Sequence, residues 1–478
     1  MLRVLFIDRA NPVFYQSIVM LAKSVRDLDL TLFFLTDRQP SRIDGNLEIV
    51  NVRDIPQSVD IAELERRWGV SVQKALTPER SFFDYSTFRR CQTYSKLSLD
   101  EIERKVLPYL NGLDYLIREK ADIVIEGVVD NFLTSAMRYV ALAYGKEFRM
   151  AHVHYWWFDG LFFVDRIDQT SNEVDDRYAY YRAHPEAVDR ARMDEVFKGK
   201  RFRPKPGVLP LKMRLQQLAA RFGSYEPLSL QHWLCRRISA AISRNLIRLL
   251  SPGDKGPHQD EEYVLYPLQM SPEASLLGAV PEQADQFGLL KNISMNLPYG
   301  VRLYVKEHPR QQMGYALDYG FYRRLMSLPN VRYLRREAAL PELIDSDNCR
   351  GVIIVTGTLG LEAAIHYRKP VFLFGPALYG AADCFYKPKS FTEFYQQVQT
   401  VRRGEFKFDD EALYAELQAL DDTVVRADID IRQAKDWVDT ALSSGPIFRE
   451  FLLRSLRKRI SSRPDQANRA FAEPTRSA

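Results

Sequence analysis

Two stretches of the sequence place anion-binding residue types directly after apolar runs. One is VRLYVKEHPR at Val301–Arg310, and the other is GVIIVTGTLGLE at Gly351–Glu362. Each begins with β-branched and other apolar residues and stops at polar or small ones, as a buried parallel strand does at its carboxyl end. Ligands of open α/β sheets bind outside these carboxyl ends, so we expect the two neighbouring tips to face one ligand that carries a phosphate.

The turn after the second run is a candidate phosphate site. Thr356 and Thr358 supply hydroxyl donors, and Gly357 and Gly360 let the backbone come close. The helix expected next adds backbone amides and the positive end of its dipole. The turn contains no GK[ST] and lacks the full dinucleotide fingerprint, so the alternative is a tight turn without a ligand. Glu362, one turn into the helix, can reach a ribose diol or serve packing or solvation.

The His-Pro after the first run completes the expected anion site. His308 can donate a hydrogen bond, or a proton when charged, to a phosphate oxygen, and Pro309 fixes the turn. Lys306 and Arg310 add positive charge at the same edge. The alternative is a structural histidine, but its position beside a second anion-binding tip favours the ligand role.

The loop LQMSPEASL, after an earlier apolar run, adds polar groups to the same rim. Gln269, Glu273 and Ser275 can bind a base, a ribose or a sugar hydroxyl. A capped helix with Ser271 as N-cap and Pro272 at the first helical position is the alternative, and both interpretations can hold together.

The surrounding pattern is that of a doubly wound α/β protein. From about residue 263 to 402, strand-like and helical runs alternate strictly, which predicts a parallel sheet. Residues 2 to about 153 open in the same strand–helix–strand order. Charges and prolines interrupt the middle, and SPGDKGPHQD at 251–260 is typical of an interdomain linker. We therefore predict two Rossmann-like domains with parallel sheets facing each other across a cleft, with additional helices in the middle and at the C-terminus.

Composition narrows the class of protein. A chain of 478 residues is long enough for two or three domains, and 46% hydrophobic residues exclude a disordered chain. The net charge of +5 gives no global nucleic-acid signature. The opening MLRVLFIDRA is expected to be a strand rather than a signal peptide. The sequence contains no uninterrupted run of about 18 apolar residues, so no membrane span is predicted. The four cysteines are far apart, which fits a reducing compartment, so we expect a cytoplasmic protein.

The span from about residue 263 to 379 resembles the capsule polysaccharide biosynthesis family. The resemblance is carried by PLQMSPEASL, the Asp285–Gln286 pair, LYVKEHP, VTGTLGLEA and KPVFLFGPALY. It implies a GT-B-like glycosyltransferase, and some members transfer Kdo from CMP-Kdo. It also implies that the His-Pro and hydroxyl-bearing tips hold the CMP phosphate and ribose. Many relatives have Ser-Ser or Ser-Thr where this chain has Thr356-Gly357-Thr358, and the amino-terminal half matches only as a general acceptor domain.

The order of elements along the chain gives the expected domain limits, and the resemblance gives the roles of the two larger domains. We expect an acceptor domain at 1–169, a helical or linker region at 170–260 and a nucleotide-sugar domain at 261–405. Helices are expected at 406–445 and a basic, partly disordered tail at 446–478.

The expected reaction needs neither a cofactor nor a metal. A departing nucleotide phosphate gains one negative charge, which a helix amino terminus and His308 can stabilise. The carboxylate pairs that begin at Asp345 and Asp428 are discounted as metal sites, because each falls in a predicted helical segment. The base, or the nucleophile of a retaining reaction, should come from the amino-terminal domain. Glu126 is the first candidate, followed by Asp8 and Asp130, and each can instead cap a helix or pair with an arginine.

We therefore predict a glycosyltransferase of bacterial surface polysaccharide synthesis that uses CMP-Kdo or a related CMP-sugar. Its expected partners are the nucleotide-sugar donor and a glycan or lipid-linked acceptor, with no nucleic acid. Peripheral contact with the inner membrane surface is expected through the basic segment Phe451–Ile460, and Trp233–Leu250 is a second candidate. The alternatives are a CDP-polyol phosphotransferase of teichoic-acid type, a nucleotide-sugar epimerase and a non-catalytic assembly or export factor.

Overall fold

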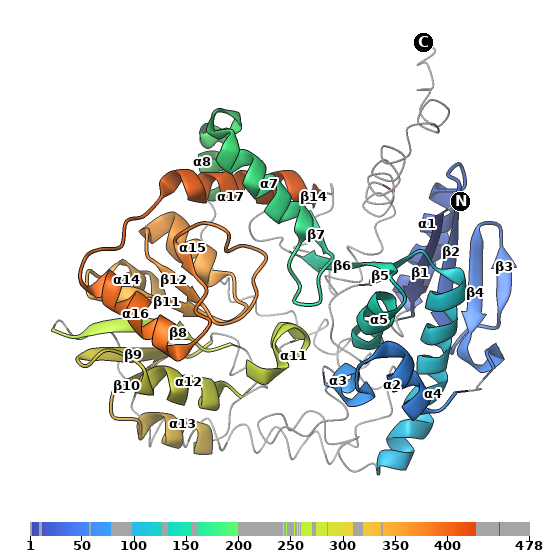
Figure 1. The fold of residues 1–478 in the computed structure, drawn as a ribbon, viewed down its shortest axis with the longest axis horizontal. Coiled ribbons are helices and arrows are strands. Elements are labelled where there is room, and N and C mark those ends of the chain that lie inside the picture. The colour runs from blue at the N-terminus through green and yellow to red at the C-terminus, as the bar shows by residue number, and fades with distance from the viewer. Residues whose placement is uncertain are drawn as a thin grey trace.

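The computed structural model describes eleven stretches of the chain and six isolated residues. Within them the chain forms two α/β units, each built around its own sheet (Figure 1). The described residues are 2–8, 12–56, 59–77, 98–126, 132–153, 160–198, 260–269, 274–283, 285–308, 319–335 and 338–426, with 242, 245, 253, 256, 258 and 449.

The N-terminal unit contains an eight-stranded sheet in the order β14-β7-β6-β5-β1-β2-β4-β3. The five strands from β6 to β4 run parallel, and antiparallel pairs occur at both ends of the sheet. The strands are β1 (Leu2–Ile7), β2 (Leu30–Thr36), β3 (Arg42–Asp44), β4 (Leu47–Asn51), β5 (Ile123–Glu126), β6 (Glu147–Val153), β7 (Gly160–Val164) and β14 (Val425–Arg426).

Helices cover both faces of this first sheet because successive residues of its strands point to opposite sides. In β1, Val4 and Phe6 pack into the core beneath α1, whereas Leu5 and Ile7 pack against α2 to α5. The α4 helix starts at a capping box in which Ser98 and Glu101 bond each other's backbone N–H groups. The helices are α1 (Pro12–Ser24), α2 (Ile61–Trp68), α3 (Val72–Leu76), α4 (Leu99–Tyr115) and α5 (Phe132–Ala143).

The C-terminal unit contains a six-stranded sheet in the order β10-β9-β8-β11-β12-β13, and all five strand pairs are parallel. Val264 and Tyr266 of β8 face the core beneath α12, α13 and α16, while Tyr263 and Leu265 face the opposite core. The strands are β8 (Glu262–Pro267), β9 (Val301–Lys306), β10 (Val331–Leu334), β11 (Cys349–Ile354), β12 (Val371–Leu373) and β13 (Phe385–Tyr386). The helices are α11 (Ala274–Ala279), α12 (Gln286–Met295), α13 (Tyr319–Met326), α14 (Leu340–Asp345), α15 (Leu359–Tyr367), α16 (Phe391–Arg402) and α17 (Asp410–Thr423).

Helices α7 (Asn172–Ala183) and α8 (Arg190–Lys198) join the two units by packing on α17 (Figure 1). Arg192 Nη2 lies 2.6 Å from Oδ2 of the fully buried Asp421. After α17, strand β14 pairs with β7, so the chain returns to the first sheet. One apolar cluster accordingly runs from Phe162 in the first sheet to Leu417 of α17 and Leu265 in the second sheet.

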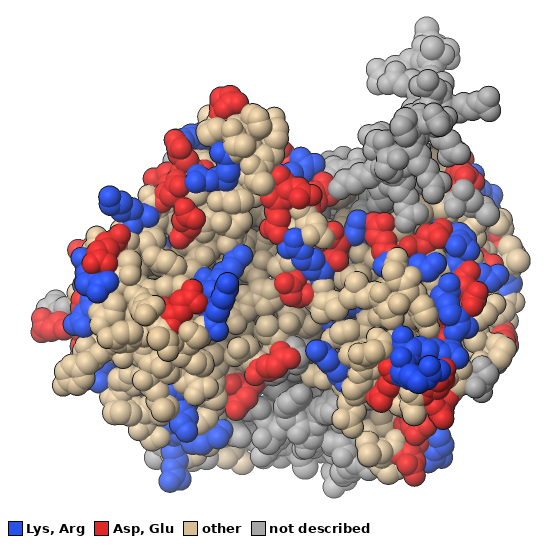
Figure 2. Space-filling view, in the orientation of Figure 1, with Lys and Arg blue, Asp and Glu red and all other residues tan. Residues whose placement is uncertain are grey.

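The predicted fold class is confirmed, with two α/β units built on Rossmann-like sheets. The prediction of parallel sheets holds for the second unit throughout, and the first unit adds antiparallel strands at its edges. On the face shown in Figure 2, Lys and Arg are interspersed with Asp and Glu over both units. No single basic field covers the described residues of that face, in line with the small net charge.

Candidate functional site

Three strand tips form the candidate site: the two that were predicted to face one ligand, and the tip of β8, whose loop was predicted to lie on the same rim. In the sheet order, β8 lies between β9 and β11, so the His308 tip and the Thr356 tip flank a third tip rather than each other. All three strands are parallel, so their carboxyl ends meet at one edge of the sheet. The first polar side chain after β8 at this edge is Gln269.

Gln269 is held in place by a second glutamine, Gln286, at the start of α12. The side-chain amide of Gln286 accepts from Gln269 N at 2.9 Å and donates to Gln269 O at 3.1 Å. Both residues are buried, so this exchange satisfies backbone groups that solvent does not reach. In the sequence, Gln286 belongs to a motif of the family resemblance and has no predicted role of its own. A polar residue at the start of an apolar helical pattern was the available signal.

The Gln269 side chain lies against the Thr-Gly-Thr turn. A Cβ atom placed on Gly357 would come within 3.0 Å of Gln269 Nε2. On the other side of the turn, the Tyr379 hydroxyl donates to Gly357 O, and a Cβ on Gly360 would lie 2.6 Å from the Tyr379 oxygen. Glycine is therefore required at position 360 by close packing, and the turn is enclosed by Gln269 and Tyr379.

Helix α15 begins immediately after this turn, with Thr358 at its N-cap position. The Thr358 side chain makes no capping hydrogen bond to the helix, so its hydroxyl is not committed to closing the first turn. The amide end of α15 thus lies at the same sheet edge as the β8 tip, as predicted. Glu362 is buried, with 6% of its surface exposed. Packing in the first turn of α15 therefore accounts for part of its role.

The β9 tip contains a buried acid that the sequence analysis did not single out. Glu307 is 5% exposed, and its two carboxylate oxygens accept from the Tyr322 hydroxyl at 3.0 Å and the Tyr333 hydroxyl at 3.1 Å. Lys306 is also buried, and its Nζ lies 3.4 Å from Glu307 O. His308, by contrast, is half-buried. The two tyrosines come from α13 and β10, so they anchor the strand immediately before His308.

The candidate bases of the N-terminal unit lie at the ends of adjacent strands. Glu126 is the last residue of β5, which pairs with β1, and its side chain is only 1% exposed. Asp8 follows β1 and accepts a hydrogen bond from the Thr36 hydroxyl at 2.5 Å. The structure therefore brings these two carboxylates to one edge of the first sheet. Asp130 lies outside the described residues.

Other predicted site residues also fall outside the described part of the chain. Glu273, Pro309 and Arg310 are among them, and for Ser275 only the backbone position in α11 is described. No cluster of three or more metal-ligating side chains occurs within the described residues. Asp345 ends α14, as the sequence predicted, and Asp428 is not described.

Neither predicted membrane contact can be placed in the structure. Most of Trp233–Leu250 and all of Phe451–Ile460 lie outside the described residues. No described helix is both long and apolar enough to cross a bilayer. Just before the basic segment, Arg449 Nη1 and Nη2 each lie 3.1 Å from the Asp27 carboxylate of the first unit.

Three solved structures show how far the overall likeness to known proteins extends. The beta Kdo 2,7 transferase KpsC of Thermosulfurimonas dismutans is 14% identical, with 67% of this chain and 88% of that chain covered and a TM-score of 0.30. Anabaena Alr3699/HepE, solved with UDP-glucose, is 11% identical over 94% and 99% of the two chains, with a TM-score of 0.29. WaaG, a glycosyltransferase involved in lipopolysaccharide biosynthesis, is 11% identical, with 94% of this chain and 99% of that chain covered and a TM-score of 0.24. Likeness at this level does not carry a function from those proteins to this chain.

The family model is more informative because it covers the candidate site. No curated protein sequence matches the chain. The model described as "Capsule polysaccharide biosynthesis protein" matches residues 225–386, which include the β8, β9 and β11 tips and Tyr379. The resemblance predicted from the sequence is thereby confirmed: residues 225–386 of the chain match the family model of capsule polysaccharide biosynthesis proteins.

Proposed function

We propose that the protein is a glycosyltransferase of bacterial surface polysaccharide synthesis that takes its sugar from a CMP-activated donor, with Kdo or a related sugar as the transferred group. The observation that carries the proposal is the assembled edge of the second sheet. There, Gln269 and the Thr356–Thr358 turn lie beside the amino end of α15, and His308 follows β9 at the same sheet edge within the family region. These groups suit a nucleotide phosphate and an adjoining ribose or base.

The proposed chemistry follows from where charge develops. When the bond between the sugar and the phosphate breaks, the departing nucleotide gains a negative charge. The amides at the start of α15, the hydroxyls of Thr356 and Thr358 and the imidazole of His308 are donors fixed by the fold before the reaction. Such preorganised donors stabilise the developing charge without reorganising, and removal of one typically costs about 2.7–4 kcal/mol of activation free energy. In this proposal Glu126 or Asp8 accepts the proton of the attacking acceptor hydroxyl.

Donor class is tested by the thermal stabilisation that CMP, CDP and UDP give. At about 100 times its dissociation constant, a nucleotide adds about 2.7 kcal/mol to the free energy of unfolding. We expect CMP to stabilise most. A larger response to CDP would favour polyol-phosphate transfer, and a response to none of the three would contradict the proposed site. Donor screening with product detection on lipid-linked acceptors then identifies the transferred group.

The role of His308 at the β9 tip can be tested with a second histidine, His258, as a control. His308→Asn removes the proposed phosphate donor and should lower turnover about 10²–10³-fold. His258→Asn is the control, because the His258 backbone lies beside the Tyr304 hydroxyl and Tyr304 also bonds Glu261, which precedes β8. Equal turnover in the two variants would remove His308 from the mechanism.

The proposed base is tested separately from donor binding. Glu126→Gln should abolish most transfer while the stabilisation by CMP remains, because the substitution leaves the second unit untouched. Undiminished turnover of Glu126→Gln would shift the role to Asp8, for which Asp8→Asn is the corresponding variant.

A further inference from the structure

A buried arginine lies where the two units meet. Arg138 on α5 is 1% exposed and is among the largest fully buried side chains of the described residues. Burial lowers the pKa of its guanidinium. Burying a cation costs free energy of folding unless its N–H groups are hydrogen-bonded. The hydrogen-bond partners of Arg138 therefore indicate its role.

Within the described residues, Arg138 donates to neutral oxygens from both units. Nη1 donates to Ile167 O at 2.7 Å, and Nη1 and Nη2 each donate to Gly278 O at 3.2 Å. Nη2 also lies 3.4 Å from Ser135 Oγ on its own helix. Nε has no hydrogen-bond partner among the residues that the structure describes. The planar guanidinium thus holds two separate carbonyls at once, which a lysine ammonium on a flexible stem does less well.

The two helices linked in this way each follow a strand of the candidate site. Gly278 belongs to α11, the first described helix after the β8 tip that carries Gln269. Arg138 belongs to α5, the first described helix after β5, which ends at Glu126. Figure 1 shows α11 extending from the second unit toward α5 and α3 of the first. The Arg138–Gly278 contact therefore connects the proposed donor side directly to the proposed base side.

We propose that Arg138 is a positioning residue that fixes the donor-side helix α11 against the base-side helix α5. This role rests on the proposed function, because it assigns transfer to groups on both units. Bringing two reactants together requires their reacting atoms to approach within about 3–3.5 Å, and a misplacement of about 1 Å can cost about 10²-fold in rate. A buried cation bonded to carbonyls of both units restricts such a displacement, whereas a solvated ion pair adds little restraint.

The test compares Arg138→Met and Arg138→Lys with Arg118→Met. Arg118 is a matched control because it belongs to the same unit and bonds Asp114 and Glu119, both within that unit. Amide hydrogen exchange in residues 274–279, turnover, the donor KM and stabilisation by CMP are measured on the full chain. Exchange reports how readily α11 opens locally and does not depend on activity.

For Arg138→Met we expect exchange in α11 to rise about tenfold through local opening. Turnover should fall about 10²-fold, with the donor KM and the CMP response nearly unchanged. Exchange in α11 and turnover of Arg138→Lys should lie between the values of the wild type and of Arg138→Met. Arg118→Met should lower the melting temperature but leave exchange in α11 and turnover at their wild-type values.

Wild-type exchange in α11 and wild-type turnover in a folded Arg138→Met protein would overturn the proposal. If Arg138→Met does not fold, Arg138→Lys decides by the same two measurements. An equal fall of turnover in Arg118→Met would also overturn it, because the effect would then be general destabilisation. If no nucleotide binds the wild type, the proposed function fails, while the exchange measurements still decide whether Arg138 holds α11.

Discussion

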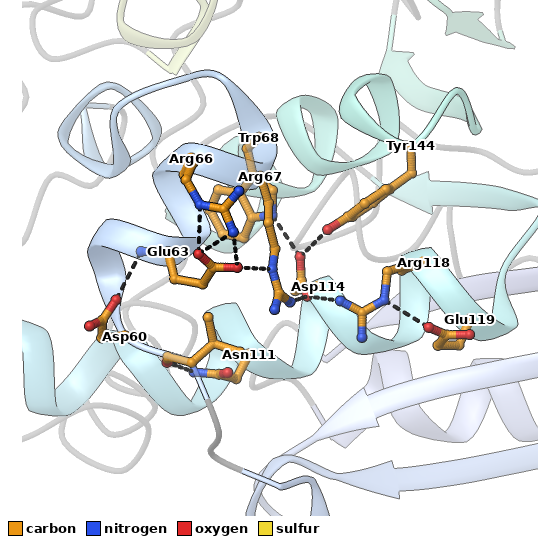
Figure 3. A network of polar contacts seen from close by, with 11 residues as sticks. Asp60, Glu63, Arg66, Arg67, Trp68, Asn111, Asp114, Arg118, Glu119 and Tyr144 are labelled. Atoms are coloured by element: carbon orange, nitrogen blue, oxygen red, sulfur yellow. Dashed lines mark hydrogen bonds and ion pairs between the residues drawn. The ribbon is translucent and has the colours of Figure 1, made fainter.

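Buried acids are held differently in the two units. In the N-terminal unit, Asp114 of α4 is 3% exposed and accepts from Trp68 Nε1 at 2.9 Å and the Tyr144 hydroxyl at 2.6 Å. Two guanidinium groups complete its surroundings, Arg67 at 2.9 Å and Arg118 at 2.8 Å (Figure 3). These donors come from α2, from the segment after α4 and from the residues after α5, so one carboxylate on α4 joins the helices on that face of the sheet.

In the C-terminal unit, two buried acids near the candidate site bond neutral donors instead. Glu307 accepts from two tyrosine hydroxyls, and the fully buried Glu416 of α17 accepts from three consecutive backbone N–H groups. Burial raises the pKa of Glu416, and the three N–H groups partly offset that rise. Arginine-bound acids do occur in this unit: the fully buried Asp421 of α17 bonds Arg192, and Glu261 and Glu262 lie at the amino end of β8, opposite the site.

The difference shows two uses of a buried carboxylate. Around Asp114, guanidinium groups neutralise the acid and join helices, so the result is stability of the unit. At the site edge, hydroxyl and amide donors fix a strand tip and a loop without adding a cation beside the proposed phosphate position. We therefore expect substitutions at Asp114 to change stability alone, and substitutions at Glu416 and Glu307 to change ligand binding or turnover as well.

The largest effect is expected for Glu416→Ala. It leaves the N–H groups of residues 380–382 buried without their acceptor, which should lower the free energy of unfolding by about 3 kcal/mol or more. This loop directly follows Tyr379, whose hydroxyl bonds Gly357 O, so stabilisation by CMP should also weaken. Chemical denaturation and nucleotide titration check both effects. Glu411→Ala is the control, because Glu411 is exposed on the same helix. Equal losses of stability and of nucleotide binding in the two variants would contradict the role of Glu416 as the acceptor that holds this loop.

The second-largest effect on stability is expected for Asp114→Asn. It removes the negative charge that two guanidinium groups bond, and hydrogen bonds to charged groups contribute about 1.5–3 kcal/mol each. We expect a loss of about 2 kcal/mol in the free energy of unfolding, measured by urea denaturation, with the CMP response intact. Asp100→Asn, at the exposed start of the same helix, is the control. Loss of the CMP response in Asp114→Asn would show that the two regions are coupled and would end the distinction drawn here.

Glu307→Gln should have a smaller effect on stability. The glutamine oxygen can still accept from one tyrosine, but its NH₂ group faces the other hydroxyl, which must turn to accept. The expected loss is about 1 kcal/mol in the free energy of unfolding, with a clear fall in turnover because the strand before His308 is less firmly held. Thermal denaturation and initial rates measure the two quantities. Glu342→Gln on α14 is the exposed control. Unchanged turnover in Glu307→Gln would limit Glu307 to packing.

The sequence predicted the regular part of this site well, because strand ends leave a local signal. Val301–Lys306 forms β9 over the predicted residues, and the Thr-Gly-Thr turn does open a helix. The site residues that were not predicted from the sequence are held by contacts with distant positions in the chain. Gln286 bonds a backbone 17 positions away, and Tyr333 reaches Glu307 from 26 positions away. No local pattern specifies such partners, since they depend on how strands are ordered in the sheet.

The same reason explains why β8 was not recognised as the strand between the two tips. Its sequence is as apolar as those of its neighbours, and sheet order is set by crossover connections rather than by the strand itself. Arg138 was missed for a related reason. Within a helical pattern an arginine is typical of a solvated face, and only the packing of α11 against α5 shows it to be buried.

The smallest effect concerns Glu261, at the edge of the second sheet away from the site. The Arg332 guanidinium, whose Nε lies 3.0 Å from Glu261 Oε2, lowers the pKa of this carboxyl to about 2. In the unfolded chain a glutamate titrates near pH ~4.3. Because the folded pKa is the lower one, the stabilisation is complete above about pH 4.3 and is lost as the pH falls toward 2. Glu261→Gln should therefore cost about 1 kcal/mol at pH 7 and almost nothing near pH 2, measured by urea denaturation across this range. The CMP response at pH 7 should stay at its wild-type value, since this acid contributes to stability from the edge opposite the site. A loss that does not depend on pH would show that packing, and not the ion pair, is what Glu261 provides.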